Sequence, residues 1–499
     1  MVFPSSSVGK STFPAKLPLR KAAPQVLSLL TLGATMNLEQ LKQDLQRENT
    51  WRDNPSGWMG TDSDLRRVME EPFEYTPNIL ANLTEGGLYI LHGPRRVGKS
   101  VETKRKILEL TSSGVDPTCI IHASVEGWDQ WDLRLLVDAG EALSPSDAHR
   151  WWFIDEIQSV DGWGYGIKWL RDNNYRFGND TVVLTGSSSA GMREAMGALA
   201  GRRGAALEAD PVLLPMGFRT FARLVNPRLA TLELVPHSLD ELAPEQLALL
   251  ASTLANWQWA LVPAWDLYLR VGGFPQAVAE YLQPSERRDT IYGNIRSIVR
   301  DDAFRRSRTS ETQNNELLRR FCSGLGSPVN KERWAREIDT SPATLGRRLD
   351  DLMEAFIIWP AYKESKMFPK LRAQEKLYFS DPIYVALVNG VQVEPSVLSE
   401  QQLGMALARS LERKQNGYSR HERVMYHHSS SDTEIDFVGR DFGGFAVESR
   451  FVNKGWKVRT VTLARSRWNG IVATRSVLDV SDPALMAIPA GMLAWLIDN

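Results

Sequence analysis

The sequence holds one complete phosphate-binding motif. Residues Gly93 to Ser100 fit the pattern G-x-x-x-x-G-K-[ST], and they lie between the apolar run Leu88 to Leu91 and a helical stretch from Val101 to Leu110. In that setting the two glycines let successive backbone N–H groups point at a phosphate, and the N-terminus of the following helix adds partial positive charge. We expect Lys99 to reach the β- and γ-phosphates of a bound nucleotide and Ser100 to ligate Mg²⁺.

A later apolar run ends in two carboxylates. Trp151 to Ile154 is typical of a buried strand, and Asp155 and Glu156 follow it directly. Beside a phosphate loop, Asp155 can hold the hydrated Mg²⁺, while Glu156 can orient and polarise the water that attacks the γ-phosphate. An isolated Asp-Glu pair is usually a solvated turn, so this assignment depends on the phosphate motif. Because water activation is needed for hydrolysis but not for binding, the pair predicts an ATP hydrolase with ATP and Mg²⁺ at its site.

Further candidate groups, two hydroxyls and a guanidinium, lie later in the sequence. The run Val182 to Thr185 ends in a Ser-rich turn, where Thr185 or Ser187 can sense the γ-phosphate, although such turns often end strands without a ligand. Arg202 can neutralise charge on the transferred phosphate, from the same chain or from a neighbouring copy, or it can belong to an ordinary surface Arg pair. The catalytic candidates are Glu156, Lys99 and Arg202. The residues expected to hold the nucleotide are Gly93, Pro94, Arg95, Arg96, Val97, Gly98, Lys99, Ser100, Val101 and Ser187.

These motifs together resemble one family of prokaryotic ATPases. The segments that carry the likeness are Leu91 to Ser100, Phe153 to Gln158, Leu184 to Ser188, Leu199 to Arg202, Leu214 to Phe218, Tyr268 to Leu269, Gly272 to Pro275 and Lys376 to Asp381. They are similar to the AAA-type ATPases in which a P-loop domain precedes a winged helix and a C-terminal restriction-endonuclease-like domain of uncertain function. The likeness extends from about residue 70 to near the C-terminus. It implies an α/β fold with a parallel P-loop sheet, a helical segment with a winged helix-turn-helix, and a C-terminal α/β domain.

Two alternating runs near the C-terminus predict a β-hairpin. It comprises Glu434 to Val438, the turn Asp441 to Gly444, and Phe445 to Arg450. If residue 440 pairs with residue 444, Asp436 lies opposite Glu448 and Glu434 lies opposite Arg450, all on one face. Facing carboxylates repel each other unless a cation or a proton lies between them, so Asp436 and Glu448 are candidate ligands of a second Mg²⁺.

The resemblance to this family implies that the hairpin corresponds to the active-site region of a nuclease fold. It looks like the D…E-x-K pattern of the restriction-endonuclease fold, with Glu400 on the preceding helix as a further acid. Arg450 stands where the family pattern has Lys, and a guanidinium does not readily lose a proton, which puts any role as a base in doubt. Three interpretations stay open: an active nuclease, a degenerate binding domain, and a scaffold with cross-strand ion pairs such as Glu434 with Arg450.

A helix-turn-helix pattern lies upstream of the hairpin. Residues 329–338 and 343–355 have helical patterns, and the turn 339–342 separates them. Their basic residues can contact DNA phosphates, although winged helices often serve only to pack domains together. These residues are Arg333, Arg336, Arg347 and Arg348. His427 and His428 are adjacent on an expected strand and point to opposite faces, which disfavours a shared metal site.

Composition limits the class of protein. Of the 499 residues, 59 are Lys or Arg and 60 are Asp or Glu, so a net charge of −1 provides no global field for nucleic acid, though a local patch can bind it. The two cysteines, Cys119 and Cys322, are far apart and predict neither a zinc site nor a disulfide framework, which fits a reducing cytoplasm. No run of about 18 apolar residues occurs, so no membrane-spanning helix is expected.

The N-terminal leader allows two interpretations. Residues 1–36 carry basic side chains and then the apolar stretch Val26 to Ala34, a pattern that resembles a signal peptide. Alternatively, the native protein starts at Met36, which opens an ordinary amphipathic helix. We favour the second interpretation, because a nucleotide site needs the cytosolic ATP pool.

The sequence therefore predicts several parts and one main function. The parts are a basic leader that need not be native (1–36), a helical N-terminal segment (37–80), an AAA-type ATPase domain (81–225), a helical linker (226–310), a winged helix (311–385) and a restriction-endonuclease-like domain (390–499). We expect a cytoplasmic protein whose Mg²⁺-dependent ATP hydrolysis rearranges the winged-helix and nuclease-like modules, with duplex DNA, a protein partner or a second copy as candidate partners and no membrane. The alternatives are an ATP-dependent switch that signals through proteins without DNA, and an ATP-gated nuclease.

Overall fold

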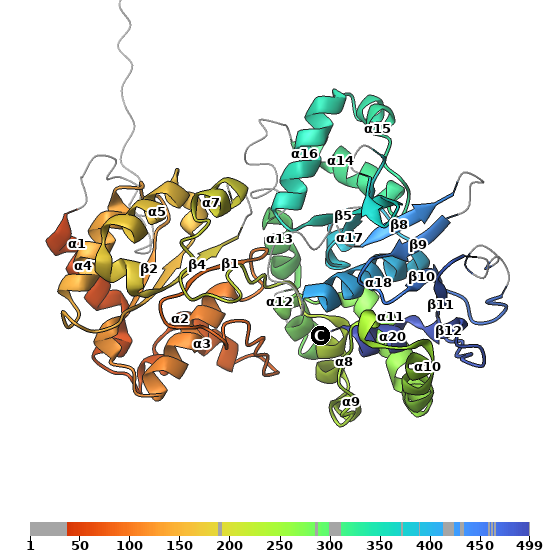
Figure 1. Ribbon diagram of the computed structural model, residues 1–499, viewed down its shortest axis with the longest axis horizontal. Coiled ribbons are helices and arrows are strands. Elements are labelled where there is room, and N and C mark those ends of the chain that lie inside the picture. The colour runs from red at the N-terminus through yellow and green to blue at the C-terminus, as the bar shows by residue number, and fades with distance from the viewer. Residues whose placement is uncertain are drawn as a thin grey trace, which may run out of the picture.

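The computed structural model describes residues 37–187, 192–284, 288–298, 311–370, 373–388, 390–412, 424–429, 434–457, 460, 463 and 466–498. The described chain forms an N-terminal α/β body and a C-terminal α/β body, each built on one sheet (Figure 1). The leader, residues 1–36, lies outside the described residues. Within the described ranges, no helix has the length and apolar character needed to cross a membrane.

The first sheet contains the four apolar runs that the sequence predicts as strands. Its strands are all parallel and stand in the order β1-β4-β3-β2. Their bounds are β1 (Leu88–His92), β2 (Ile120–Ser124), β3 (Trp151–Asp155) and β4 (Thr181–Gly186). The prediction of a parallel sheet is confirmed. The carboxyl ends of all these strands therefore meet at one edge, where α/β sheets bind their ligands.

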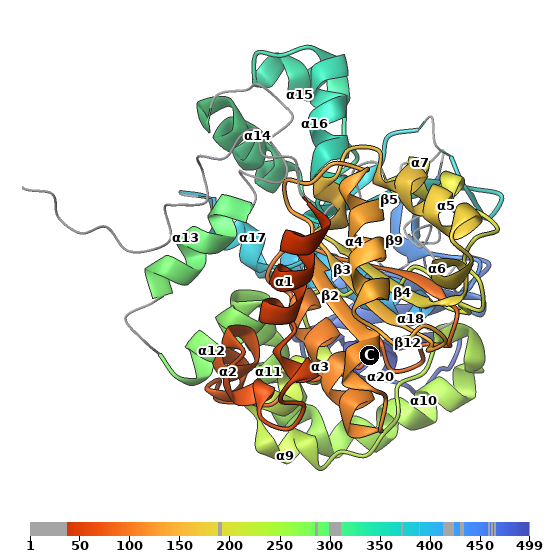
Figure 2. The ribbon, with the colours of Figure 1, turned by 90° about the vertical axis from the view of Figure 1, so that its left-hand side faces the viewer.

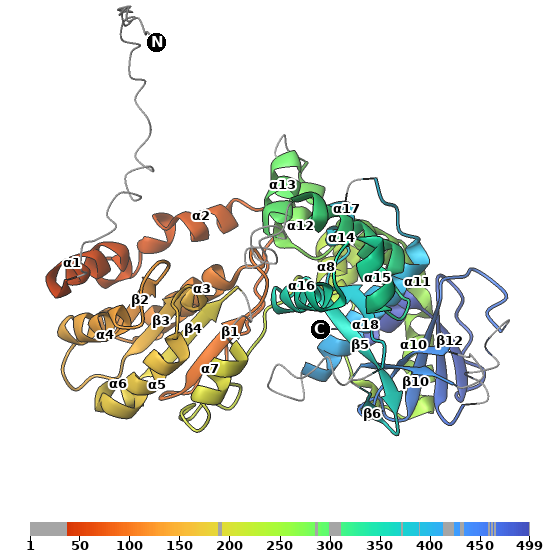
Figure 3. The ribbon, with the colours of Figure 1, turned by 90° about the horizontal axis from the view of Figure 1, so that it is seen from above.

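Helices cover both faces of this sheet (Figure 3). Leu91 packs in the same apolar cluster as Ile107 of α3, whereas its neighbour Ile90 packs with Leu136 of α4 and Ile167 of α5. Burial on both faces explains why the strands are continuous apolar runs rather than alternating ones. The helices of this body are α1 (Leu38–Glu48), α2 (Ser63–Met69), α3 (Lys99–Ser112), α4 (Asp132–Ala142), α5 (Trp163–Asn173), α6 (Tyr175–Asn179) and α7 (Met192–Ala198).

After α7 the chain returns along the outer edge of β1. The backbone N of Leu88 donates to the carbonyl O of Arg203 at 2.9 Å, and the N of Leu213 donates to the O of His92 at 2.8 Å. The returning segment runs parallel to β1, with which it forms a bridge at His92. It begins beside the amino end of β1 and reaches the carboxyl end at Leu213, next to the phosphate motif.

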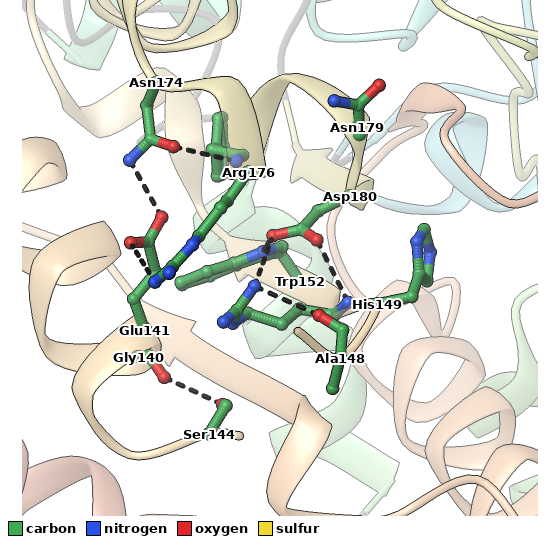
Figure 4. A network of polar contacts seen from close by, with 12 residues as sticks. Gly140, Glu141, Ser144, Ala148, His149, Trp152, Asn174, Arg176, Asn179 and Asp180 are labelled. Carbon is green, nitrogen blue, oxygen red and sulfur yellow. Dashed lines mark hydrogen bonds and ion pairs between the residues drawn. The ribbon is translucent and has the colours of Figure 1, made fainter. Parts of the chain in front are cut away.

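A buried polar network lies at the amino ends of β3 and β4 (Figure 4). The Asp180 carboxylate accepts hydrogen bonds from the backbone N of Arg150 at 3.0 Å and from Trp152 Nε1 at 2.9 Å. It also lies 3.8 Å from the Arg150 guanidinium. Nearby, Asn174 donates to Glu141 at 2.8 Å. Arg150 and Asp180 are both almost fully buried, so each depends on the other for charge compensation.

The second sheet continues across the expected boundary between residues 385 and 390. Its order is β12-β11-β10-β9-β8-β5-β6, and β7 pairs with the first half of β5. Tyr362 of β5 pairs with Met425 of β8, so a strand of the expected winged helix lies in the same sheet as the strands that follow residue 390. The bounds are β5 (Ile358–Ser365), β6 (Phe368–Pro369), β7 (Lys376–Phe379), β8 (Met425–His428), β9 (Glu434–Val438), β10 (Phe445–Arg450), β11 (Asn469–Thr474) and β12 (Leu485–Pro489).

The helix-turn-helix pattern corresponds to two helices of the C-terminal body. These are α15 (Lys331–Glu337) and α16 (Pro342–Glu354), and Asp339 between them has a left-handed φ of +49°. Other described helices of this body are α8 (Phe218–Val225), α9 (Pro227–Ala230), α10 (Pro244–Thr253), α11 (Gln258–Val271), α12 (Pro275–Leu282), α13 (Arg288–Ile298), α14 (Glu311–Gly324), α17 (Ile383–Ala386), α18 (Pro395–Glu412) and α20 (Ala490–Ile497).

Buried polar contacts fasten the segment that leaves the first sheet to the C-terminal body. The backbone N of Met216 donates to the O of Gly273 at 2.8 Å, and the N of Phe218 donates to Asp498 Oδ2 at 2.6 Å. Asp498 also pairs with Arg409 of α18 at 3.4 Å. The connection between the two bodies is therefore anchored both at Gly273, just before α12, and at Asp498 near the C-terminus.

Candidate functional site

The phosphate motif forms the turn between β1 and α3. Gly93 has φ +140° and Gly98 has φ +106°, a region that favours glycine. A Cβ atom at Gly93 would lie 1.9 Å from the carbonyl O of Leu213, so the returning segment leaves no room for a side chain. The Lys99 ammonium donates to the carbonyl O of Gly93 at 2.8 Å and to that of Pro94 at 2.9 Å. The loop thus holds a positive charge beside the first turn of a helix, which is an arrangement suited to phosphate.

Ser100 and Asp155 form the candidate Mg²⁺ site. Ser100 Oγ donates to Asp155 Oδ2 at 2.7 Å, and the Thr185 hydroxyl donates to the other carboxylate oxygen. Burial acts to raise the pKa of Asp155, but hydrogen bonds from Thr185 and Ser100 and the nearby His122 and Lys99 outweigh it and hold that pKa below its usual value. Asp155 is therefore ionised at neutral pH. An ionised carboxylate beside a hydroxyl fits the preference of Mg²⁺ for hard oxygen ligands.

Glu156 lies directly after β3 and is held by hydrogen bonds. Its backbone has a left-handed φ of +57°, a conformation that non-glycine residues adopt mostly where the surroundings impose it. Its carboxylate accepts from the Gln158 amide and from Ser187 Oγ, the latter at 3.4 Å. Arg95 Nε in the phosphate loop donates to the same Ser187 Oγ at 3.4 Å. The structure therefore brings Glu156, Ser187 and the phosphate loop together, as the sequence predicts.

A cavity of about 220 Å³ opens in front of the phosphate loop. The loop, the start of α3 and Glu156 form one side of it. Residues 64–77, which include most of α2, and Pro275–Gln276 at the start of α12 complete the lining; Figure 2 shows α2, α3 and α12. The apolar members of the lining are Val68, Phe73, Tyr75, Pro77, Val97, Val101 and Pro275. A cavity with a phosphate-binding side and an apolar side suits a nucleotide, whose base is flat and largely apolar.

The second side of this cavity has no motif in the sequence. Residues 37–80 are predicted only as a helical segment, whereas the structure packs residues 64–77 against α3. Lys104 of α3 lies 2.8 Å from Asp64, and burial raises the pKa of Tyr75 to about 12. The available signal is the apolar residue at every second position from Phe73 to Pro77, which indicates an extended segment with one buried side.

Arg202 lies away from the cavity. Its Nε donates to both carboxylate oxygens of Asp172 on α5, at 2.8 and 3.0 Å. The adjacent Arg203 bonds to Leu88 at the amino end of β1, whereas the phosphate loop follows the carboxyl end of that strand. The structure therefore does not bring Arg202 to the nucleotide site of its own chain. A catalytic role for Arg202 would require the site of a neighbouring copy.

The C-terminal hairpin has the register that the sequence predicts. Phe437 pairs with Val447, which places Asp436 opposite Glu448. Glu448, however, pairs with Arg450 on its own strand. Burial raises the pKa of Glu448 to about 7 despite that pairing.

Lys376 of β7 lies among the other carboxylates near the hairpin, although no sequence motif marks it as a site residue. Its ammonium group contacts Glu400, Glu434 and Asp436. Burial raises the pKa of Glu400 to about 7. The expected ligands of a second Mg²⁺, Asp436 and Glu448, are therefore each compensated by a different basic side chain.

The remaining candidates are the histidines of β8 and the arginines of the helix-turn-helix. His427 Nδ1 lies 3.0 Å from Glu364, and the described ranges contain no group of three or more His, Cys, Asp or Glu side chains arranged to hold a metal ion. Among the arginines of the helix-turn-helix, Arg348 is 2% exposed and cannot reach a DNA phosphate in this conformation. Arg333 pairs with Glu337 at 2.8 Å, whereas Arg336 and Arg347 are exposed.

Comparison with protein families gives two matches. Residues 85–222 match the family model described as an AAA domain, and this range contains the phosphate loop, both acids at the carboxyl end of β3 and Ser187. Residues 85–222 are an AAA-type ATPase domain. Residues 262–392, which follow the AAA-type domain, match a family described as a domain of unknown function (DUF8612). No curated protein matches the sequence.

Solved structures similar to this chain are of low sequence identity. A Walker-type ATPase of Pyrococcus abyssi is 14% identical, with a TM-score of 0.38 and an alignment over 65% of this chain and 93% of that one. The Aeropyrum pernix ORC2 protein in its ADPNP–ADP complexes is 12% identical, with a TM-score of 0.32 and 65% and 86% of the two chains covered. The Aeropyrum pernix ORC1 protein in complex with DNA is 14% identical, with a TM-score of 0.28 and 66% and 92% covered.

Proposed function

We propose that ATP binding and Mg²⁺-dependent hydrolysis by the AAA-type domain change its arrangement relative to the C-terminal body, which carries the helix-turn-helix. The observation that carries this proposal is the composition of the cavity. Its lining combines the phosphate loop with Pro275–Gln276, the first residues of α12 in the C-terminal body. A nucleotide held there would contact both bodies at once, so its binding energy could favour one relative arrangement.

The hydrolytic step rests on position and charge. Bound Mg²⁺ would neutralise charge on the phosphates, with Ser100 and Asp155 as its protein ligands. Lys99 would hold the β- and γ-phosphates, and Glu156 would orient the attacking water. Ser187, which is hydrogen-bonded to Glu156, would respond to the γ-phosphate.

The start of α12 is tied rigidly to the strands of the C-terminal body. The backbone N of Gly273, two residues before α12, donates to Asp381 Oδ2 at 2.8 Å. Asp381 is fully buried, follows β7, and accepts a second bond from the N of Ile383 at 2.9 Å. A displacement of Pro275–Gln276 by nucleotide would therefore be transmitted to β7 and the sheet that it joins.

Replacement of Gln276 by Ala tests this coupling. Gln276 lines the cavity, and its Oε1 is buried without a hydrogen-bond partner in the described chain, so an amino group of the adenine base is a suitable donor. Loss of one such bond is expected to raise KM for ATP by up to about tenfold with little change in kcat. It should also reduce the ATP-induced protection of residues 376–383 from hydrogen exchange.

Gln283→Ala is the matched control for Gln276→Ala, because Gln283 is an exposed residue just after α12. It should leave both KM and hydrogen exchange unchanged. If Gln276→Ala behaved like Gln283→Ala in both measurements, α12 would not couple the nucleotide to the C-terminal body.

Duplex DNA is the partner that we propose for the C-terminal body. Its support is the pair of exposed arginines, Arg336 and Arg347, on the helix-turn-helix. We expect duplex DNA to raise the ATPase rate severalfold at low salt, less so at high salt, and to lose most of this effect in the variant R336A/R347A. Arg223→Ala, which removes an exposed arginine of α8, is the control. Absence of stimulation at any salt concentration would instead favour a switch that acts through protein partners.

A further inference from the structure

Lys376 is a fully buried lysine whose ammonium group lies among three carboxylates. The Nζ atom is 2.5 Å from Glu434, 3.2 Å from Glu400 and 3.4 Å from Asp436. The residue is 0% exposed. An ammonium group has three N–H donors, and each of the three carboxylates can accept one of them. A lysine buried this deeply is stable only with such compensation.

The carboxylates come from two elements of the C-terminal body and are fixed by further bonds. Glu400 belongs to α18, and Glu434 and Asp436 belong to β9. The Tyr378 hydroxyl donates to Glu400 at 2.6 Å, and the backbone N of Ser449 donates to the second oxygen of Asp436 at 2.8 Å. The lysine therefore joins β7 to α18 and β9 through groups that are already oriented to receive a cation.

A divalent cation bound by these carboxylates would lie beside the ammonium group. Mg²⁺ and similar ions bind carboxylate oxygens at about 2.0–2.1 Å, and a positive ion at that distance from these oxygens would crowd and repel the ammonium group. Glu448, the remaining acid of the hairpin, is already paired with Arg450. Occupation of the cluster by Lys376 therefore opposes occupation by a metal ion.

We propose that the Lys376 ammonium group is the resident cation of the cluster formed by Glu400, Glu434 and Asp436, that it excludes divalent metal ions from the hairpin, and that the C-terminal body therefore binds its partner without cutting DNA. The exclusion of metal ions does not depend on the ATPase cycle, whereas the binding of a partner rests on the proposed function. The charged contacts of this cluster hold β7, α18 and β9 together.

Mn²⁺ binding to the full, nucleotide-free chain tests the proposal. The wild type and the variant Asp436→Asn should give the same Mn²⁺ titration by electron paramagnetic resonance, because neither holds a metal at the hairpin. Lys376→Met removes the ammonium group but keeps the length of the side chain. This variant should gain one Mn²⁺ site, which the double variant K376M/D436N should lose again.

Two results would overturn the proposal. The first is a wild-type Mn²⁺ site that disappears in Asp436→Asn, especially if wild-type protein with Mn²⁺ also cleaves plasmid DNA and the variant does not. The second is a folded Lys376→Met protein with no additional Mn²⁺ site. If Lys376→Met does not fold, the comparison of wild type with Asp436→Asn still decides the question.

Lys370→Met is the matched control for the lysine substitution. Lys370 is exposed and lies just after β6 in the same part of the chain. Its replacement should neither create a Mn²⁺ site nor lower Tm. Lys376→Met, in contrast, should lower Tm because it leaves three partly buried carboxylates without their cation, and Mn²⁺ should restore part of the loss.

Discussion

Replacement of Glu156 by Gln is expected to leave ATP bound and to slow its hydrolysis by about 10²- to 10⁴-fold. Gln has nearly the same size as Glu and keeps an acceptor oxygen for the contacts with Gln158 and Ser187. It lacks the negative charge that polarises the attacking water in the proposed mechanism, so the hydrolytic step should lose its base while the phosphate contacts remain. Phosphate release at saturating ATP and Mg²⁺, together with a nucleotide titration, measures both effects.

Two further variants complete this test. Lys99→Ala removes the ammonium group that the phosphate loop holds through Gly93 and Pro94, and it should abolish ATP binding itself. Glu85→Gln changes an exposed acid in the turn before β1 and should hydrolyse ATP at the parental rate. Turnover at the parental rate in Glu156→Gln would show that another group activates the water.

The first sheet and the phosphate site could be predicted because their signals are local. Each strand is an apolar run, and the phosphate loop is a contiguous motif between a strand and a helix. Asp155 ends β3 and Glu156 follows it, so the order of parallel strands alone places them at the edge where Lys99 begins α3. The hairpin register was equally accessible, because a short turn and a period of two fix which residues face each other.

The partners of Lys376 could not be predicted, because their proximity depends on the second sheet. Lys376 meets Glu434 and Asp436 of β9 only because β5, which pairs with β7, also pairs with β8 beside β9. A local pattern does not show which distant strands will be neighbours. The hairpin is therefore predictable, but the neighbours of its charges are not: Glu434 faces Arg450 in the register, yet its ion pair is with Lys376.

Arg202 and the wall of the cavity show the same limitation. The motif around Arg202 follows the Ser-rich turn in sequence, but the chain returns to the amino end of β1 before it runs back toward the phosphate loop. Residues 64–77 and Pro275–Gln276 lie on opposite sides of the AAA-type domain in sequence and meet only in the fold. Whether these residues reach the nucleotide site depends on how the chain folds and not on their residue types.

Asp180→Ala is expected to lower the free energy of unfolding of the AAA-type domain by about 3–5 kcal/mol. The substitution leaves the Arg150 guanidinium buried without its carboxylate, and it removes the acceptor of Trp152 Nε1 and of the Arg150 backbone N. For a body of this size the corresponding fall in Tm is roughly 6–20 °C. Thermal unfolding followed by tryptophan fluorescence measures it, and Asp180→Asn, which keeps an acceptor oxygen but removes the charge, should give an intermediate value.

The control for Asp180→Ala is another Asp–Arg pair of the same domain. Asp172 pairs with Arg202 at 2.8 Å, but the two side chains are 39% and 33% exposed, so water can replace the lost contact. Asp172→Ala should therefore change Tm little, although it removes the same chemical group. Equal shifts for the two variants would mean that burial of Arg150 and Asp180 does not determine their contribution. A large shift for Asp180→Ala alone would show that the network at the amino ends of β3 and β4 stabilises the sheet whose opposite edge carries the nucleotide site.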